Sequence, residues 1–270
     1  MTKLTGDTEM FLWDGGCAFV GNSSARTAVH SHQAIQLTYG TDADLQMGWS
    51  AEGPWVSGRL LLVASHQSHI MDATAISLGV TMFVEPETIA GRALSALCPH
   101  EGITALDPAP AAEALAELFA GFVARRGDAV ISASARRVVT QLTDGVEPRQ
   151  ATNERIVRAL AWLNEHIHEQ VTLDQVAAAV FLSPSRFRHL FVEEMGMGLR
   201  PWLLWRRFMR TWGMIMEGAT ISRAAHAAGF ADAAHFTRTS NRMIGVAPSG
   251  FRVSHTPAAL AEAQSRAAKP

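Results

Sequence analysis

Short apolar runs separated by turn-forming residues fill roughly residues 17–106 of the chain. Residues 34–39 and 60–64 are two such runs, and clusters of Gly, Pro, Asp and Ser, such as residues 40–42 and 52–54, lie between them. Apolar runs of this length with regular breaks are typical of antiparallel strands. The pattern predicts a small antiparallel barrel or sandwich in the first part of the chain.

The period of the apolar positions changes after this region. Within residues 111–126 large apolar side chains recur at steps of three and four, which predicts an amphipathic helix. A second helix is predicted over about residues 129–143. The segment 144–150 is polar and contains Gly and Pro, so we place a domain boundary there.

Beyond the boundary almost every segment has helical spacing. Three residues are placed to cap successive helices, and these are Asn153, Thr172 and Ser183. Gln175 completes a capping box with Thr172, and Pro184 suits the first turn of its helix. A longer helix is predicted over about residues 201–216. The predicted fold class is therefore α+β, with a β-rich first domain and an all-α second domain.

The helical half contains an internal repeat. Residues 177–201 and 225–252 follow the same plan, and Phe187 and Phe236 stand 49 positions apart, as do Gly196 and Gly245. Gly229 stands where a sharp turn with positive φ is needed, and Asp232 is placed to cap the helix after it. Each copy predicts a helix-turn-helix, whose second helix enters the major groove of DNA.

The charge of the two halves differs in sign. Residues 1–150 contain 9 Lys and Arg against 16 Asp and Glu, whereas residues 151–255 contain 12 Arg against 8 acidic residues. A basic half joined to an acidic half indicates that the basic half meets a polyanion, although drift in composition gives the same signal. Further arginines of this half are expected to meet phosphates or acidic neighbours: Arg206, Arg207, Arg210 and Arg242.

The helical half resembles the DNA-binding domain of the AraC/XylS family of bacterial transcription regulators over about 100 residues. The matching positions are Ala177, residues 183–185, Phe187, Phe191, Gly196, residues 204–208, Gly229, Phe230, Asp232, His235, Phe236, Arg238, Gly245, Pro248 and Arg252. The resemblance implies a DNA-binding domain at residues 151–255. The alanine-rich residues 256–270 are expected to form a frayed tail. It also implies that a cupin-like sensing and dimerisation domain occupies residues 1–145.

Base-facing positions follow from the resemblance. They are Ser185, Arg188 and His189 in the first copy, beside the outward-facing Arg186, and Ala233, Ala234, Thr237 and Arg238 in the second. Arginine can contact two acceptors of guanine at once, whereas alanine offers only methyl contacts. The first copy is therefore expected to supply most sequence discrimination. Ser240 stands where the family usually has a buried phenylalanine, so the second copy is expected to pack less firmly.

Histidines are the candidate chemistry of the first domain. His30 and His32 would share one face of a strand, and with His69 they resemble the metal motif of true cupins. Imidazole ligands suit zinc, iron, nickel or copper. The carboxylate that usually follows the paired histidines is missing from residues 33–36, so two alternatives stay open. One is an organic effector bound by His30, His32, His69 and Trp49, and the other is a structural role for the histidines.

The function that these features predict is a transcription regulator that binds double-stranded DNA as a homodimer. Helix 111–126 is expected either to pair two subunits or to pack on its own domain, and RNA polymerase is a further candidate partner. Two cysteines, no signal peptide and no apolar run of membrane-spanning length predict a cytoplasmic protein without a membrane partner.

Other classes of function predict different residues. No motif for serine, phosphate-loop or zinc-protease chemistry is present, so the chain is not expected to be an enzyme. The alternatives are a metal-dependent cupin enzyme with a helical appendage and a constitutive DNA-binding protein whose barrel only dimerises.

Overall fold

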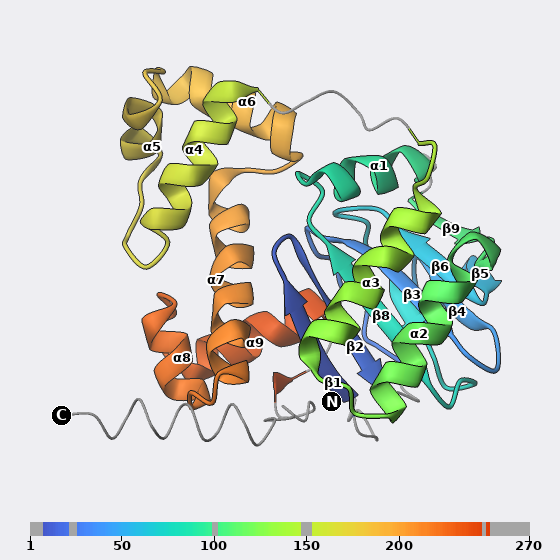
Figure 1. Cartoon of the computed structure of the whole chain (residues 1–270). Helices are drawn as coiled ribbons and strands as arrows, with labels where there is room; N and C mark the ends of the chain where they lie inside the picture. The colour runs from blue at the N-terminus through green and yellow to red at the C-terminus, as the bar shows by residue number, and fades with distance from the viewer. Residues whose placement is uncertain (1–7, 22–25, 99–101, 147–152, 245–246, 249–270) are drawn as a thin grey trace. The chain divides into compact units, whose positions relative to one another are not determined.

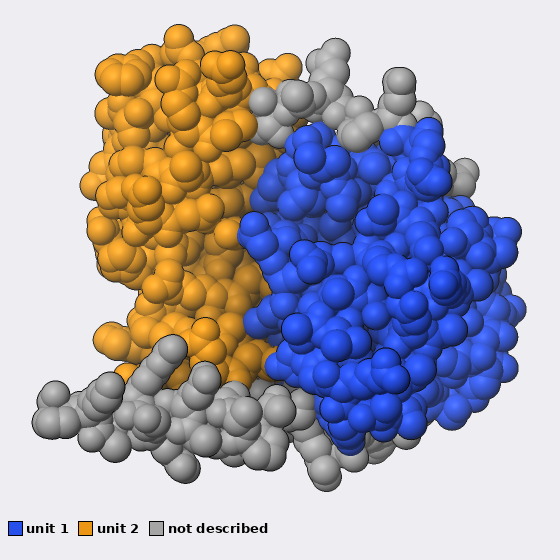
Figure 2. All heavy atoms as spheres, in the orientation of Figure 1, with its two compact units in different colours: residues 1–149, 240–254 blue, residues 150–239, 255–270 orange. Residues whose placement is uncertain are grey.

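A computed structural model gives the fold of the chain and describes residues 8–21, 26–98, 102–146, 153–244 and 247–248 (Figure 1). The chain forms two compact units (Figure 2), of which the first contains residues 1–149 and 240–254 and the second residues 150–239 and 255–270. The division after Arg149 falls at the end of the polar segment 144–150. Of the described residues, 240–244 are grouped with the first unit, and the predicted bounds of the DNA-binding domain stay a prediction. Gly245, Arg252 and the predicted tail lie outside the described residues.

The β-rich region consists of two antiparallel sheets. Six strands lie in the order β1-β2-β8-β3-β6-β9, and three in the order β5-β4-β7. Their bounds are β1 Thr8–Trp13, β2 Gly16–Gly21, β3 Ile35–Gly40, β4 Leu45–Gly48, β5 Trp55–Gly58, β6 Leu60–Val63, β7 Ile70–Asp72, β8 Gly79–Val84 and β9 Ile103–Leu106. The predicted strands 34–39 and 60–64 are β3 and β6, and they pair with Leu37 opposite Leu62.

The larger sheet is buried on both faces. Alternation along β6 sends Leu60 and Leu62 into a core shared with the helices of this unit, and Leu61 and Val63 into a second core with residues of β4. All four side chains are fully buried, which explains the continuous apolar run in this strand. Both faces of the sheet therefore hold the first unit together.

Three α-helices and one short 3₁₀ helix accompany the sheets: α1 Ile89–Leu97, η1 Ala109–Ala111, α2 Ala112–Val123 and α3 Asp128–Leu142. The predictions at 111–126 and 129–143 are confirmed as α2 and α3. Helix α1 corrects the expectation of mainly β structure up to residue 106. Its N-cap is Thr88, whose hydroxyl accepts from the backbone N–H of Gly91 at 2.9 Å.

The apolar face of α2 is used inside the first unit. Leu115, Leu118 and Phe119 are buried in the same core as β3 and β6. Packing of α2 on its own domain is therefore observed. A pairing role for α2 would have to use its opposite face, where Val123 is 71% exposed.

The second unit is helical, as predicted. Its helices are α4 Glu154–Glu165, α5 Leu173–Ala179, α6 Pro184–Met195, α7 Leu199–Met216, α8 Ile221–Ala227 and α9 Ala233–Ile244. Asn153, Thr172 and Ser183 cap α4, α5 and α6 as predicted, and the capping box of Thr172 with Gln175 is complete. The long α7 lies between the α4–α6 group and α8 (Figure 1).

Within the described ranges, no helix combines the length and the apolar character that crossing a membrane requires.

Candidate functional site

Helices α5 and α6 form the first helix-turn-helix. The end of α5 is closed by the backbone N–H of Leu182, which donates to the carbonyl of Ala177 at 2.9 Å. Phe181 takes the left-handed conformation in this turn, with φ 57°. Ser183 then caps α6 by accepting from the N–H of Arg186, and Gly196 ends the helix with φ 69°. These local rules set the direction in which α6 leaves the turn.

Helices α8 and α9 repeat this construction. Thr220 caps α8, and the N–H of Phe230 donates to the carbonyl of Ala225 at 2.9 Å. Gly229 is left-handed with φ 88°, as predicted. Asp232 accepts from the N–H of His235 at 2.6 Å, which confirms it as the cap of α9. The first helices of the two copies align at a spacing of 48 residues and the second helices at 49, so the second turn is one residue longer.

Helix α7 supplies the core of both copies. Near its start, Trp202 contacts Phe191 of α6 edge to face, with ring centroids 6.0 Å apart. Near its end, Phe208 and Trp212 lie 5.7 and 5.9 Å from the ring of Phe236 in α9. Phe187 and Phe236 are both fully buried. Each recognition helix is thus anchored by its own aromatic cluster on one shared helix.

The predicted base-facing residues of α6 lie on its exposed side. Ser185, Arg186, Arg188 and His189 are all exposed, whereas Phe187 between them is buried. Ser185, Arg188 and His189 are three and four positions apart and share one face of the helix. This face combines a hydroxyl, a guanidinium and an imidazole, which are groups that can read base edges in the major groove.

Helix α9 presents a poorer surface. Ala234 and Arg238 are exposed, whereas Ala233 and Thr237 are half-buried. The hydroxyl of Thr237 donates to the carbonyl of Ala233 at 2.9 Å, so its proton is used within the helix. Sequence reasoning missed Asn241. This residue is exposed and lies seven positions after Ala234 and three after Arg238, on the same face of the helix. That helical spacing was the signal that could have found it.

Arg207 has a different role from the one predicted. Its side chain donates to the carbonyls of Ile167 at 3.2 Å and Glu169 at 2.6 Å, and burial lowers its pKa. It therefore fastens the loop between α4 and α5 to α7 through these two backbone carbonyls. Arg206 donates to the side chain of Asn164 and lies over the ring of Trp202. Arg210 and Arg242 are exposed, as a phosphate contact requires.

The three predicted histidines of the first unit come together. His30 and His69 form an antiparallel bridge and exchange two backbone hydrogen bonds of 2.9 Å. One ring nitrogen each of His30, His32 and His69 lies within 4.8 Å of the other two, and all three residues are buried. Burial lowers the pKa of each imidazole, that of His32 to about 3. The cluster is therefore a group of neutral imidazoles.

The remaining predicted effector residue lies in different surroundings. Trp49 is half-buried and packs against the core cluster that contains Leu45 and Met47. Its contact with an effector stays a prediction.

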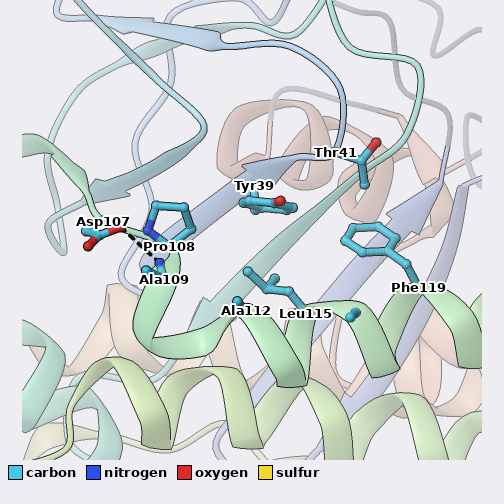
Figure 3. A pocket seen from close by; sticks show the side chains of 9 residues that line it. Tyr39, Thr41, Asp107, Pro108, Ala109, Ala112, Leu115 and Phe119 are labelled. Carbon is cyan, nitrogen blue, oxygen red and sulfur yellow. Dashed lines mark hydrogen bonds between the residues drawn. The ribbon is translucent and has the colours of Figure 1, made fainter.

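A separate cavity of about 390 Å³ opens between β3 and the start of α2. Its lining is mainly apolar, and the rings of Tyr39 and Phe119 face one another across it with centroids 6.1 Å apart (Figure 3). Asp107 lies at one end, where its carboxylate accepts from the backbone N–H of Ala109 at 2.9 Å. The cavity has the size of a small-molecule site.

Comparison with known proteins places the helix-turn-helix geometry in a family. Residues 176–254 match the family described as helix-turn-helix domain. The arabinose operon regulatory protein of Escherichia coli (strain K12) is 30% identical over 105 residues, which cover 37% of this chain and 35% of that protein. The regulatory protein PocR of Salmonella typhimurium is 25% identical over 101 residues, which cover 37% of this chain and 33% of PocR. The chain thus spans about a third of the length of these relatives.

Similarity to solved structures extends over nearly the whole chain. The crystal structure of ToxT from Vibrio cholerae O395 matches with a TM-score of 0.55 and 11% identity, over 92% of this chain and 95% of ToxT. This likeness confirms the α+β fold, in which a sheet region is followed by helices. The helix-turn-helix region, residues 176–254, is therefore similar in sequence to the DNA-binding region of the arabinose operon regulatory protein and of PocR.

Proposed function

We propose that the chain is a transcription regulator that binds double-stranded DNA through α6 and α9 and responds to a signal received by its first unit. The observation that carries this proposal is the repeated helix-turn-helix, in which each second helix is capped, anchored by a buried phenylalanine and exposed on its opposite side. The relatives are themselves regulators, which favours this function over a metal-dependent enzyme. Its place of action would be the cytoplasm, where bacterial DNA lies.

Helix α6 is proposed as the principal reader of sequence. Its exposed face carries Ser185, Arg188 and His189, and Arg186 stands beside them to meet the DNA backbone. A guanidinium that contacts two acceptors of guanine discriminates against the wrong base by roughly 1–3 kcal/mol. On α9 only Arg238 and Asn241 offer comparable groups, so this helix is proposed to set register through phosphates and to add one or two base contacts.

A homodimer is proposed through the outer face of α2. Ala112, Ala116 and Ala120 are exposed at four-residue steps along this helix, with Ala112 and Ala116 at the mouth of the cavity beside β3, and Val123 follows them with 71% of its surface exposed. Two regulators held together would bind paired half-sites. Sedimentation of the full chain tests this: a dimer that Ala116→Glu dissociates is expected, and a wild-type monomer at micromolar concentration would contradict it. RNA polymerase stays a candidate partner.

Selection from random double-stranded DNA tests the proposed function directly. The full chain should enrich one motif, and its affinity for that motif should fall steeply with salt, with a logarithmic slope of roughly −0.9 for each phosphate contacted. Enrichment of no motif, together with a flat salt response, would overturn the proposal. Adding lysate metabolites or metals to the same binding assay separates a responsive regulator from a constitutive one.

A further inference from the structure

The inner nitrogens of the three buried histidines are prepared to accept an ion. The Nδ1 atoms of His30, His32 and His69 lie 2.9, 2.7 and 2.9 Å from the backbone carbonyls of Ala28, Ala34 and Gln67. A carbonyl only accepts, so each Nδ1 carries the proton and each Nε2 keeps its lone pair. An imidazole held at Nδ1 by a carbonyl, with Nε2 unprotonated, is the arrangement in which histidine binds metals.

The side-chain amide of Gln36 occupies the space between two of these nitrogens. One end of the amide lies 3.0 Å from Nε2 of His32 and 3.1 Å from Nε2 of His69, and the other end lies 2.9 Å from the hydroxyl of Thr38. An amide oxygen facing the two Nε2 atoms would need a proton on each, and hence two adjacent buried imidazolium ions, which repel each other.

Hydrogen bonding therefore decides the orientation of the amide. The structure has Oε1 toward the histidines and Nε2 toward Thr38 and the sulfur of Met71. In the reversed orientation the NH₂ group gives one hydrogen to each histidine Nε2, and the oxygen accepts from the hydroxyl of Thr38. Every polar group of the cluster that Gln36 touches is satisfied in this orientation. Gln36 thus holds two of the three imidazoles in place by occupying their lone pairs.

We propose that His30, His32 and His69 bind a divalent transition-metal ion through Nε2, and that the Gln36 amide holds the site in its metal-free form and is displaced when the ion binds. Three neutral imidazoles suit zinc and its neighbours and leave a fourth position open. The present spread of up to 4.8 Å between the ring nitrogens exceeds the roughly 3.4 Å that tetrahedral bonds of about 2.0–2.1 Å would give. The rings must therefore close on the ion after the amide leaves.

Gln36 stands four positions after His32, among the residues where the sequence lacks a carboxylate. An amide adds no charge to the site, so three imidazoles alone would have to attract the dication. We expect a weaker and more readily reversed site than one containing a carboxylate, which suits sensing better than permanent retention. This part of the inference rests on the proposed function, whereas metal binding itself does not.

The experiment measures Zn²⁺ binding to the untagged full chain by equilibrium dialysis and elemental analysis. Wild type should hold close to one ion per chain, and Co²⁺ in its place should give the intense visible absorption of a tetrahedral site. The double variant His30→Ala/His32→Ala should lose both signals. His168→Asn is the matched control, because His168 is exposed and lies in the second unit, outside the cluster.

Gln36→Glu gives a second test that misfolding cannot imitate, because the variant is expected to bind Zn²⁺ more tightly. A carboxylate in place of the amide should raise affinity for Zn²⁺ by roughly tenfold or more, because its charge attracts the dication, whereas the amide attracts no cation and must be displaced. Absence of binding by folded wild type, or equal binding by the double histidine variant, would overturn the metal site.

Measuring DNA affinity of the same samples with Zn²⁺ and with chelator separates the two proposals. A change of fivefold or more in wild type, absent from the histidine double variant, supports the metal as the signal. Bound metal with unchanged DNA affinity would overturn the signalling part alone. Specific DNA binding without any metal binding would overturn this inference and leave the proposed function standing.

Discussion

The two helix-turn-helix copies of the second unit share one backbone plan and differ in the residues that carry it out. Both have a threonine cap, a left-handed turn residue, a second cap and a buried phenylalanine at the same point of the second helix. At the left-handed position, however, the first copy has Phe181 and the second has Gly229. The outer faces differ as well, since α6 carries Arg188 and His189 where α9 carries Thr237 and Arg238.

This difference separates the requirements of the fold from those of reading DNA. Buried positions and caps are constrained alike in both copies, because the same packing on α7 must be achieved twice. Exposed positions are free to diverge, and the proposed division into a reading helix and a bracing helix rests on them. The copies therefore predict equal responses to core substitutions and unequal responses to surface substitutions.

The largest expected effect tests the shared core. Phe187→Ala and Phe236→Ala should each destabilise the second unit by about 3–5 kcal/mol, since both rings are fully buried among aromatic side chains. Urea unfolding followed by far-UV circular dichroism measures this. A much smaller cost for Phe236→Ala would show that the second copy is loosely packed, as the presence of Ser240 instead of phenylalanine led us to expect.

The next effect tests the division between reading and bracing. Arg188→Ala should cost about 1–3 kcal/mol at the preferred DNA site and relax the choice of base at one position. Arg238→Ala should cost less and reduce the salt slope by roughly 0.9, as the loss of one phosphate contact does. Titration of labelled DNA at several salt concentrations distinguishes the two, with the exposed Arg126 of the first unit as the control for substitution. Equal loss on all sequences for Arg188→Ala would reverse the assignment.

Local rules explain why much of this fold could be predicted from the sequence. Caps such as Ser183 and Asp232 act within three residues, and a left-handed Gly229 follows from a single turn. The helix α1 was missed because Gly91 weakens its pattern. That glycine is required by a tertiary contact, since a Cβ there would lie 2.0 Å from the carbonyl oxygen of Glu85.

Side-chain roles set by distant contacts escaped prediction for the same reason. Arg207 looks like a phosphate ligand on a helix surface, yet its partners lie about 40 positions earlier in the chain. The histidine cluster was predicted as a set because His30 and His32 were expected to alternate on one strand. The structure corrects this basis, since both residues precede β3 and His30 forms only an isolated bridge with His69. The role of Gln36 beside these histidines could not be predicted, because it depends on how its side-chain amide is oriented between His32 and His69 in the folded chain.

A smaller effect tests the turn of the second copy. Gly229→Ala should destabilise the second unit by about 1–2 kcal/mol, because a left-handed L-residue is strained. A Cβ at this position would also lie 3.1 Å from Nε of Arg207, which fastens the loop before α5. Thermal unfolding measures the cost. Gly145→Ala in the first unit shows the effect of the backbone strain alone, since it has φ 73° with no atom within 4 Å of the added carbon.

The smallest expected effect lies at the corresponding turn of the first copy. Phe181 carries the strain that glycine avoids, and its side chain is 87% exposed, so the folded unit gains little from the ring. Phe181→Gly should therefore stabilise the second unit by about 0.5–1 kcal/mol after the added freedom of the unfolded chain is subtracted. Phe181→Ala removes the ring but keeps the strain, and it should leave stability nearly unchanged. If both variants instead weaken DNA binding without altering stability, the exposed ring contacts the DNA or another partner. The first turn would then keep a strained phenylalanine for binding, and not because the fold merely tolerates it.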